Sequence, residues 1–217
     1  MENIFLILEG IDGSGKTTIR KYIYRRLQEA ALECLTIGQH SWTIPKYAEV
    51  INNIRNKNII HTPEEIAEAF KLDKKVHYER TVRKHILERH VIADRFTYSD
   101  VVYNYVLWGI DVLNNYKAHI DSYNPQPNYI VFIDTPPDIA FNRIVKRKTN
   151  PKFWENTETL SSISQTYKKT FFDDPLPGLP PVIRIDNSGN EGWQKVVDDL
   201  VIGPIYNINN SQVHLER

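Results

Sequence analysis

The residues with the clearest chemical meaning form the run Gly10-Ile11-Asp12-Gly13-Ser14-Gly15-Lys16-Thr17, which matches the phosphate-binding pattern G-x-x-x-x-G-K-S/T. Glycines let the backbone wrap a phosphate with its N–H groups, and a following helix N-terminus adds positive potential. In this pattern the lysine reaches the β- and γ-phosphates, and the hydroxyl ligates Mg²⁺. The sequence therefore predicts a site for a nucleoside triphosphate. The expected binding residues are Gly10, Asp12, Gly13, Ser14, Gly15, Lys16, Thr17 and Thr18.

A second group of reactive side chains follows the apolar run 91–93. Asp94 would stand at the carboxyl end of a strand, where it can hold Mg²⁺ or its water shell. Arg95 offers a rigid fork that suits a phosphate. Ser99, Tyr103 and Asn104 follow at spacings that place them on or near one face of the next helix. These residues predict a second anion site beside the first.

Strands and helices must alternate to hold these residues. Apolar runs at 4–8, 91–93, 129–133 and 182–185 predict buried strands, and 35–37 is a weaker fifth. Helical patterns cover about 18–31, 63–89, 98–123, 137–148 and 193–200, and 174–181 is a proline-rich loop. This alternation predicts an α/β fold, a three-layer sandwich around a five-stranded parallel sheet.

Composition narrows the class of protein. The 217 residues fit one domain, expected over 1–201, followed by a loosely packed tail over 202–217. Lys and Arg equal Asp and Glu at 27 each, which does not favour a global grip on nucleic acid or on an anionic membrane. The five-residue apolar run near the N-terminus is too short for a signal peptide or membrane span. A single cysteine, Cys34, fits the reducing cytoplasm.

The phosphate-binding loop and the stretch 94–104 together narrow the choice of protein family. A GTPase would carry Asn-Lys-x-Asp after a later strand, and the only Asn-Lys lies in 56–59 without the aspartate. The stretch Asp94-Arg95-Phe96-Thr97-Tyr98-Ser99 through Tyr103-Asn104 instead resembles the thymidylate kinase family, with its Asp-Arg-Tyr-x-x-Ser-x-x-x-Tyr-Gln. The segments 8–13 and 70–74 resemble that family's Phe-Glu-Gly-x-Asp-Gly and Phe-x-x-Asp-Arg. The resemblance spans about residues 3–200.

The resemblance implies an ATP-dependent and Mg²⁺-dependent nucleoside monophosphate kinase, acting first on dTMP, and suggests a homodimer. Lys16 and Thr17 would handle the ATP phosphates and the metal, which Asp94 would support. Arg95 would grip the acceptor phosphate near Asp12. The remaining acceptor contacts would be Glu9 behind Asp12, Phe70 stacked on the base, Lys74 in place of the base-reading arginine, Ser99 and Asn104 at the base edge, and Tyr103 against the sugar 2′ position.

Several departures from the family pattern leave the acceptor open. The family's Arg-Glu-Pro-Gly-Gly, which helps to hold the acceptor phosphate, is absent, and 38–42 read Gly-Gln-His-Ser-Trp. Lys74 is a point charge that cannot form a fork. Asp100 adds a carboxylate near the expected pocket. The alternatives are a kinase of the same fold acting on a nucleoside or another small molecule, and a non-catalytic regulatory module that binds nucleotide.

Positive charge gathers in the segment 143–157, where the family has its lid. Arg143, Lys146, Arg147, Lys148 and Lys152 occur there, and the family's Asp-Arg-x-Glu is replaced by Lys-Phe-Trp-Glu. A solvated helix face would explain such a run. Because Ser14 leaves the phosphate-binding loop without an arginine, we expect a helical lid whose Arg143 and Arg147 neutralise the transferring phosphoryl group. Asp134, at a strand end, is either a second metal-site aspartate or a helix N-cap.

Overall fold

The computed structural model describes residues 3–124, 127–147, 150–189 and 192–207. Its strands form one all-parallel sheet in the order β2-β3-β1-β4-β5. Each strand lies within one residue of its predicted position, because uninterrupted apolar runs with turn residues at both ends are typical of buried parallel strands. The strands are β1 Phe5–Glu9, β2 Cys34–Ile37, β3 His90–Asp94, β4 Tyr129–Asp134 and β5 Val182–Asp186.

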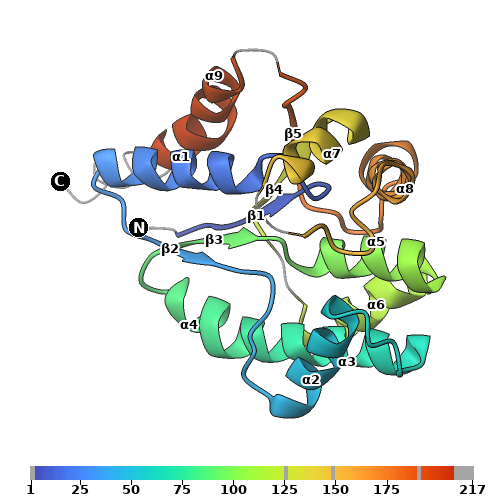
Figure 1. Ribbon diagram of the computed structural model, residues 1–217. Coiled ribbons are helices and arrows are strands. Elements are labelled where there is room, and N and C mark those ends of the chain that lie inside the picture. The colour runs from blue at the N-terminus through green and yellow to red at the C-terminus, as the bar shows by residue number, and fades with distance from the viewer. Residues whose placement is uncertain (1–2, 125–126, 148–149, 190–191, 208–217) are drawn as a thin grey trace.

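Helices cover both faces of this sheet (Figure 1), which confirms the predicted three-layer α/β class. Alternate side chains of β1 point to opposite faces. Leu6 and Leu8 pack with α1 and the C-terminal helix, whereas Phe5 and Ile7 pack with α5 and α8. The helices are α1 Lys16–Glu29, α2 Pro45–Arg55, α3 Pro63–His77, α4 Arg83–His85, α5 Thr97–Trp108, α6 Val112–Tyr123, α7 Pro137–Val145, α8 Thr157–Lys168 and α9 Trp193–Val197, with wider turns at Tyr78–Val82, Lys169–Asp173 and Asp198–Ile202.

Three expectations about the helices are corrected. The pattern over 98–123 is two helices, because Gly109 adopts a left-handed conformation (φ 69°) and ends α5. Helix α2, which begins with Pro45 in its first turn, was not predicted. The closing helix continues to residue 207 and buries Ile202 and Ile205 against α1. The loosely packed tail therefore does not begin at 202, and its remainder from 208 lies outside the described residues.

The lid and Asp134 also differ from expectation. Between α7 and α8, the described residues 146–147 and 150–156 form turns, bends and irregular chain rather than a helix. Asp134 caps no helix, since α7 has no side-chain cap. Its carboxylate instead forms ion pairs with Arg184 (2.5 Å) and Lys168 (3.1 Å). Asp134 therefore does not cap α7, and each of its carboxylate oxygens is paired with a cation.

The order of the strands fixes the place of the reactive residues. β1 is central between β3 and β4, so the segments that follow all three strands meet at one edge of the sheet. The phosphate-binding loop follows β1, Asp94 is the last residue of β3, and Arg95 follows it. In open parallel sheets, ligands bind in the crevice beyond these carboxyl ends. The two predicted groups of residues are therefore neighbours.

Candidate functional site

The loop between β1 and α1 has the backbone of a phosphate cradle. Gly10 and Gly13 have φ values of 145° and 80°, which L side chains rarely adopt. A Cβ atom on Gly13 would lie 2.3 Å from the carbonyl oxygen of Ala140, and one on Gly10 would lie 2.6 Å from that of Ile133. Both positions therefore require glycine for shape as well as conformation. The loop leads directly into α1, whose first residue is Lys16.

Lys16 is buried at the base of this cradle. Its Nζ donates to the carbonyl oxygens of Gly10 (3.0 Å) and Ile11 (2.8 Å). Burial, together with the nearby charge of Arg95, lowers the pKa of Lys16 to about 7, against the opposing effect of Asp12 and other carboxylates. The ammonium is thus poorly stabilised in the free protein. An incoming phosphate would supply the negative charge that it lacks.

A possible metal position lies at the start of α1. The Thr17 hydroxyl donates to Asp94 Oδ2 (3.3 Å), and Arg20 Nε lies 3.6 Å from the same oxygen. These oxygens suit Mg²⁺, which usually takes one or two protein ligands and completes its shell with phosphates and water. The described residues contain no group of three or more His, Cys, Asp or Glu side chains that could hold a metal by themselves. The donor set therefore fits a metal that arrives with a nucleotide.

Arg143 also reaches the phosphate-binding loop. Its guanidinium donates to the carbonyl oxygen of Asn187 (3.0 Å) and approaches that of Ser14 (3.5 Å). The Asn187 side chain donates to the same Ser14 oxygen (2.6 Å). Arg143 thus ties α7 to the loop after β5 at the side of the cradle. Arg147 is exposed, and Lys148 lies outside the described residues.

Arg95 and Asp12 join the two predicted groups. Arg95 has a left-handed backbone conformation (φ 70°), and its backbone N–H donates to the carbonyl oxygen of Leu8 (3.0 Å). This bend turns the guanidinium toward Asp12, whose Oδ1 lies 3.0 Å from it. The hydroxyl of Tyr103 donates to Asp12 Oδ2 (3.1 Å), as does the indole N–H of Trp154 (3.0 Å). Burial alone would raise the pKa of Asp12, but the charges of Arg95, Lys152 and Lys16 lower it overall.

Glu9 and Ser99 form the support behind Arg95. Glu9 is fully buried and accepts hydrogen bonds from Ser99, from Tyr167 (2.9 Å) and from the N–H of Phe96 (2.9 Å). Burial raises the pKa of Glu9, although these hydrogen bonds and Arg95 oppose the rise. The Ser99 hydroxyl also accepts from Arg95 (3.0 Å). Ser99 therefore does not face the pocket, contrary to the expectation that it contacts the edge of a base.

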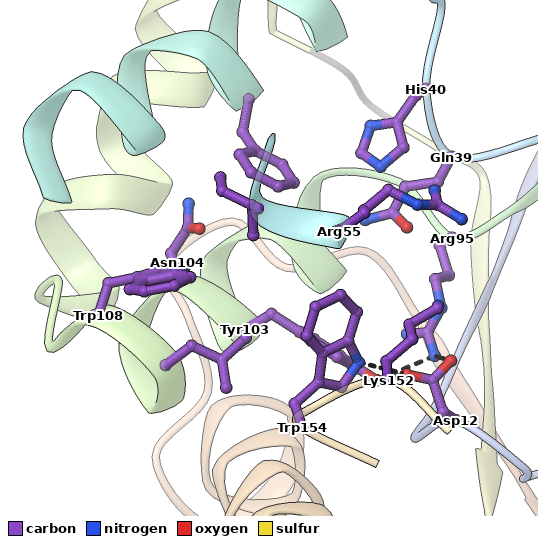
Figure 2. A pocket seen from close by; sticks show the side chains of 13 residues that line it. Asp12, Gln39, His40, Arg55, Arg95, Tyr103, Asn104, Trp108, Lys152 and Trp154 are labelled. Atoms are coloured by element: carbon purple, nitrogen blue, oxygen red, sulfur yellow. Dashed lines mark hydrogen bonds and ion pairs between the residues drawn. The ribbon is translucent and has the colours of Figure 1, made fainter. Parts of the chain in front are cut away.

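Beside this cluster lies a pocket whose empty volume of about 510 Å³ includes space that is open to solvent. Figure 2 shows Asp12 and Arg95 at one end and Asn104 and Trp108 at the other. The sequence correctly placed five of its lining residues: Asp12, Phe70, Arg95, Tyr103 and Asn104. It did not assign the remaining lining residues to the pocket, namely Gln39, His40, Ile54, Arg55, Leu107, Trp108, Lys152 and Trp154.

Lys74 does not line this pocket, which corrects its predicted role. Its side chain is fully buried, its Nζ lies 3.3 Å from Asp100 Oδ2, and it donates to the carbonyl oxygen of Gln39. The Gln39 side chain donates to the other oxygen of Asp100 (2.9 Å). Both charges are thus held inside the protein. Asp100 is not the extra pocket carboxylate that the sequence suggested.

The segment 150–156 contributes Lys152 and Trp154 to the lining of the pocket. Trp154 is 7 % exposed and packs with Val50 and Ile54 of α2, and Phe153 lies edge-on to Trp108 (6.2 Å between ring centroids). Lys152 Nζ lies 5.1 Å from the centre of the Trp154 ring. The aromatic pair at 153–154, in a charged and turn-like segment, could have predicted a pocket wall. From the sequence, this segment is instead interpreted only as the place where the family's lid pattern is missing.

Comparison with known proteins agrees with this arrangement. The family model described as "Thymidylate kinase" matches residues 8–176. A protein named thymidylate kinase from Leptospira interrogans is 29 % identical over 208 residues, covering 91 % of this chain and 92 % of its own. Probable thymidylate kinases from Sulfolobus acidocaldarius (31 %; 91 % and 93 %) and Pyrococcus horikoshii (28 %; 87 % and 89 %) are similar over comparable lengths. No described helix is long and apolar enough to cross a bilayer.

Proposed function

Because the chain belongs to the thymidylate kinase family, we propose that this phosphotransferase passes the γ-phosphoryl group of ATP to dTMP, giving ADP and dTDP. An oxygen of the dTMP phosphate forms a bond to the γ-phosphorus, while the bond from that phosphorus to the β–γ bridging oxygen breaks. Such a transfer needs alignment and charge stabilisation more than covalent help from the protein. The observation that carries the proposal is the Arg95–Asp12 pair, which joins the triphosphate cradle to the pocket lined by Phe70 and Asn104.

On the donor side, Lys16 exchanges its bonds to the carbonyl oxygens of Gly10 and Ile11 for the β- and γ-phosphates. Thr17 and Asp94 would hold Mg²⁺, which neutralises phosphate charge when bound. Arg143 stands at the side of the cradle, where its guanidinium is in place to contact the donor nucleotide. Arg147 stays a predicted lid cation.

On the acceptor side, Phe70 stacks on the base and Asn104 contacts its edge. Asn104 is 1 % exposed, and its Nδ2 has no hydrogen-bond partner within the described chain, so a base carbonyl would satisfy a buried donor. The Tyr103 ring, fixed by its bond to Asp12, crowds the sugar 2′ position and favours deoxyribose. Trp154 and Lys152 close the pocket and exclude water from the transfer.

The structure weakens one reason for a different acceptor, since Asp100 is paired with Lys74 away from the pocket. The assay is ADP production from Mg-ATP with dTMP, dUMP, UMP, dAMP and thymidine, with each product identified by mass. We expect the fastest turnover with dTMP and a marked preference for dUMP over UMP. Turnover of thymidine but not dTMP would overturn the proposal. The same proposal includes a homodimer and a cytoplasmic location. The location is supported by the presence of a single cysteine, Cys34, in the sequence.

A further inference from the structure

Three cationic side chains and one carboxylate line the acceptor pocket, namely Arg55, Arg95, Lys152 and Asp12. An excess of positive charge suits an anionic group such as a phosphate. A phosphate is held best by a guanidinium with two free N–H groups, because the fork matches two phosphate oxygens. The question is which guanidinium has such a fork available.

Arg95 is already engaged on both terminal nitrogens. Nη1 donates to Ser99 (3.0 Å) and approaches the Tyr167 hydroxyl (3.5 Å). Nη2 donates to Asp12 (3.0 Å) and to Tyr103 (3.0 Å). Each terminal nitrogen carries two N–H groups, so these four contacts engage all four terminal N–H groups, and of the five guanidinium donors only the Nε–H is not among them. Arg95 can bind a phosphate through both nitrogens only by giving up internal partners.

Arg55 is in the opposite situation. It lies at the C-terminal end of α2, and its side chain forms no hydrogen bond or ion pair within the part of the chain that the structure describes. Its only described contact with a ring is with Trp42, whose centre is 5.6 Å from the guanidinium carbon. Figure 2 shows Arg55 extending between His40 and Arg95, toward the end of the pocket where Asp12 lies. Its N–H groups are therefore free at the anion end.

We propose that Arg55 is the guanidinium that binds the phosphate of the acceptor nucleotide, an inference that rests on the proposed function. Arg95 then acts beside it, keeping Asp12 and Tyr103 in place and lending its charge. The segment after β2 contributes no guanidinium to this pocket, which it lines with Gln39 and His40.

The test measures the dissociation constants of dTMP and of thymidine by calorimetry, for the wild type and for Arg55→Gln. Loss of a charge-assisted fork should weaken dTMP binding by about tenfold or more. Thymidine, which has no phosphate, should bind within about twofold of its wild-type affinity. Arg55→Lys keeps the charge without the fork and should give an intermediate dTMP affinity. The matched control is Arg83→Gln on α4, an exposed arginine outside the pocket lining, which should change neither constant.

An equal change for dTMP and thymidine would overturn the inference, because it would place Arg55 at the base or sugar. No change for either ligand would overturn it as well. Neither result affects the proposed function if wild-type protein phosphorylates dTMP. Conversely, absence of dTMP turnover in the wild type would count against the proposed function, while phosphate-dependent binding through Arg55 would still be visible in the calorimetry.

Discussion

Lys16 should take up a proton when ATP binds. In the free protein, burial and the charge of Arg95 hold the pKa of Lys16 at about 7, and its Nζ donates to two carbonyl oxygens and to the Ser14 hydroxyl. Phosphates beside the ammonium favour its charged form and raise this pKa. Binding therefore moves the pKa from near neutrality to a higher value. The bound state must hold more protons than the free state at any pH between the two.

The size of this effect follows from the pKa of about 7. At pH 8, one unit above it, only about a tenth of free Lys16 is protonated, so ATP binding takes up about 0.9 proton. At pH 6 the uptake falls to about 0.1 proton. Above pH 7, the affinity for ATP should weaken by up to about tenfold per pH unit, because each binding event must first protonate the amine.

Calorimetry in buffers of low and high ionisation enthalpy measures this uptake directly. The control is Lys16→Arg, whose guanidinium stays charged at every accessible pH. Subtracting its proton uptake removes the contribution of ATP itself. A difference between the two proteins of about 0.9 proton at pH 8 and near zero at pH 6 is expected. Equal uptake by both proteins at pH 8 would refute the reasoning, because it would mean that Lys16 is fully charged before ATP arrives.

Three other perturbations test the site and the fold. Trp154→Phe keeps an aromatic wall but loses the N–H donor to Asp12, so the KM for dTMP should rise about two- to tenfold with the KM for ATP unchanged in steady-state assays. Gly13→Ala places a Cβ atom 2.3 Å from the carbonyl oxygen of Ala140, at a residue whose φ is 80°. The variant should lose ATP binding and have a lower Tm than the wild type. An unchanged Tm would contradict this expectation. Burial lowers the pKa of His119 to about 3, so below the unfolded value of 6.5 the unfolded state binds more protons and stability falls with pH. Urea titrations should show wild-type protein losing about 2 kcal/mol more than His119→Leu between pH 7 and pH 5.

The sequence predicted the fold well where local patterns carry the information. The apolar runs of β1 and β4 have turn residues at both ends, and parallel strands buried on both faces need little else to be recognised. Helix α2 was not predicted because its apolar face is short and follows a segment without a clear boundary. This face consists of Val50, Ile51 and Ile54. The closing helix was predicted to end at residue 200 because the Asn-rich end hid the burial of Ile205.

The site was predictable where residue order fixes position and not where pairing is long-range. Asp12 and Arg95 each follow a strand, so the sheet order brings them together. The pairing of Lys74 with Asp100 depends on how α3 packs on α5, which no local pattern reveals. The same packing moved Lys74 out of the pocket, whereas Arg55 lines it from the end of α2. Family motifs located the pocket, but the side chains that line it had to be read from the fold.

The most direct test of the central claim is to follow the γ-phosphoryl group itself. ATP labelled at the γ-phosphate is incubated with dTMP, Mg²⁺ and the protein, and the products are separated and identified by mass. The account predicts one labelled dTDP for each ADP formed, with the label in the terminal phosphate, and loss of this transfer in Lys16→Ala. Label released as inorganic phosphate while dTMP stays unchanged would contradict it.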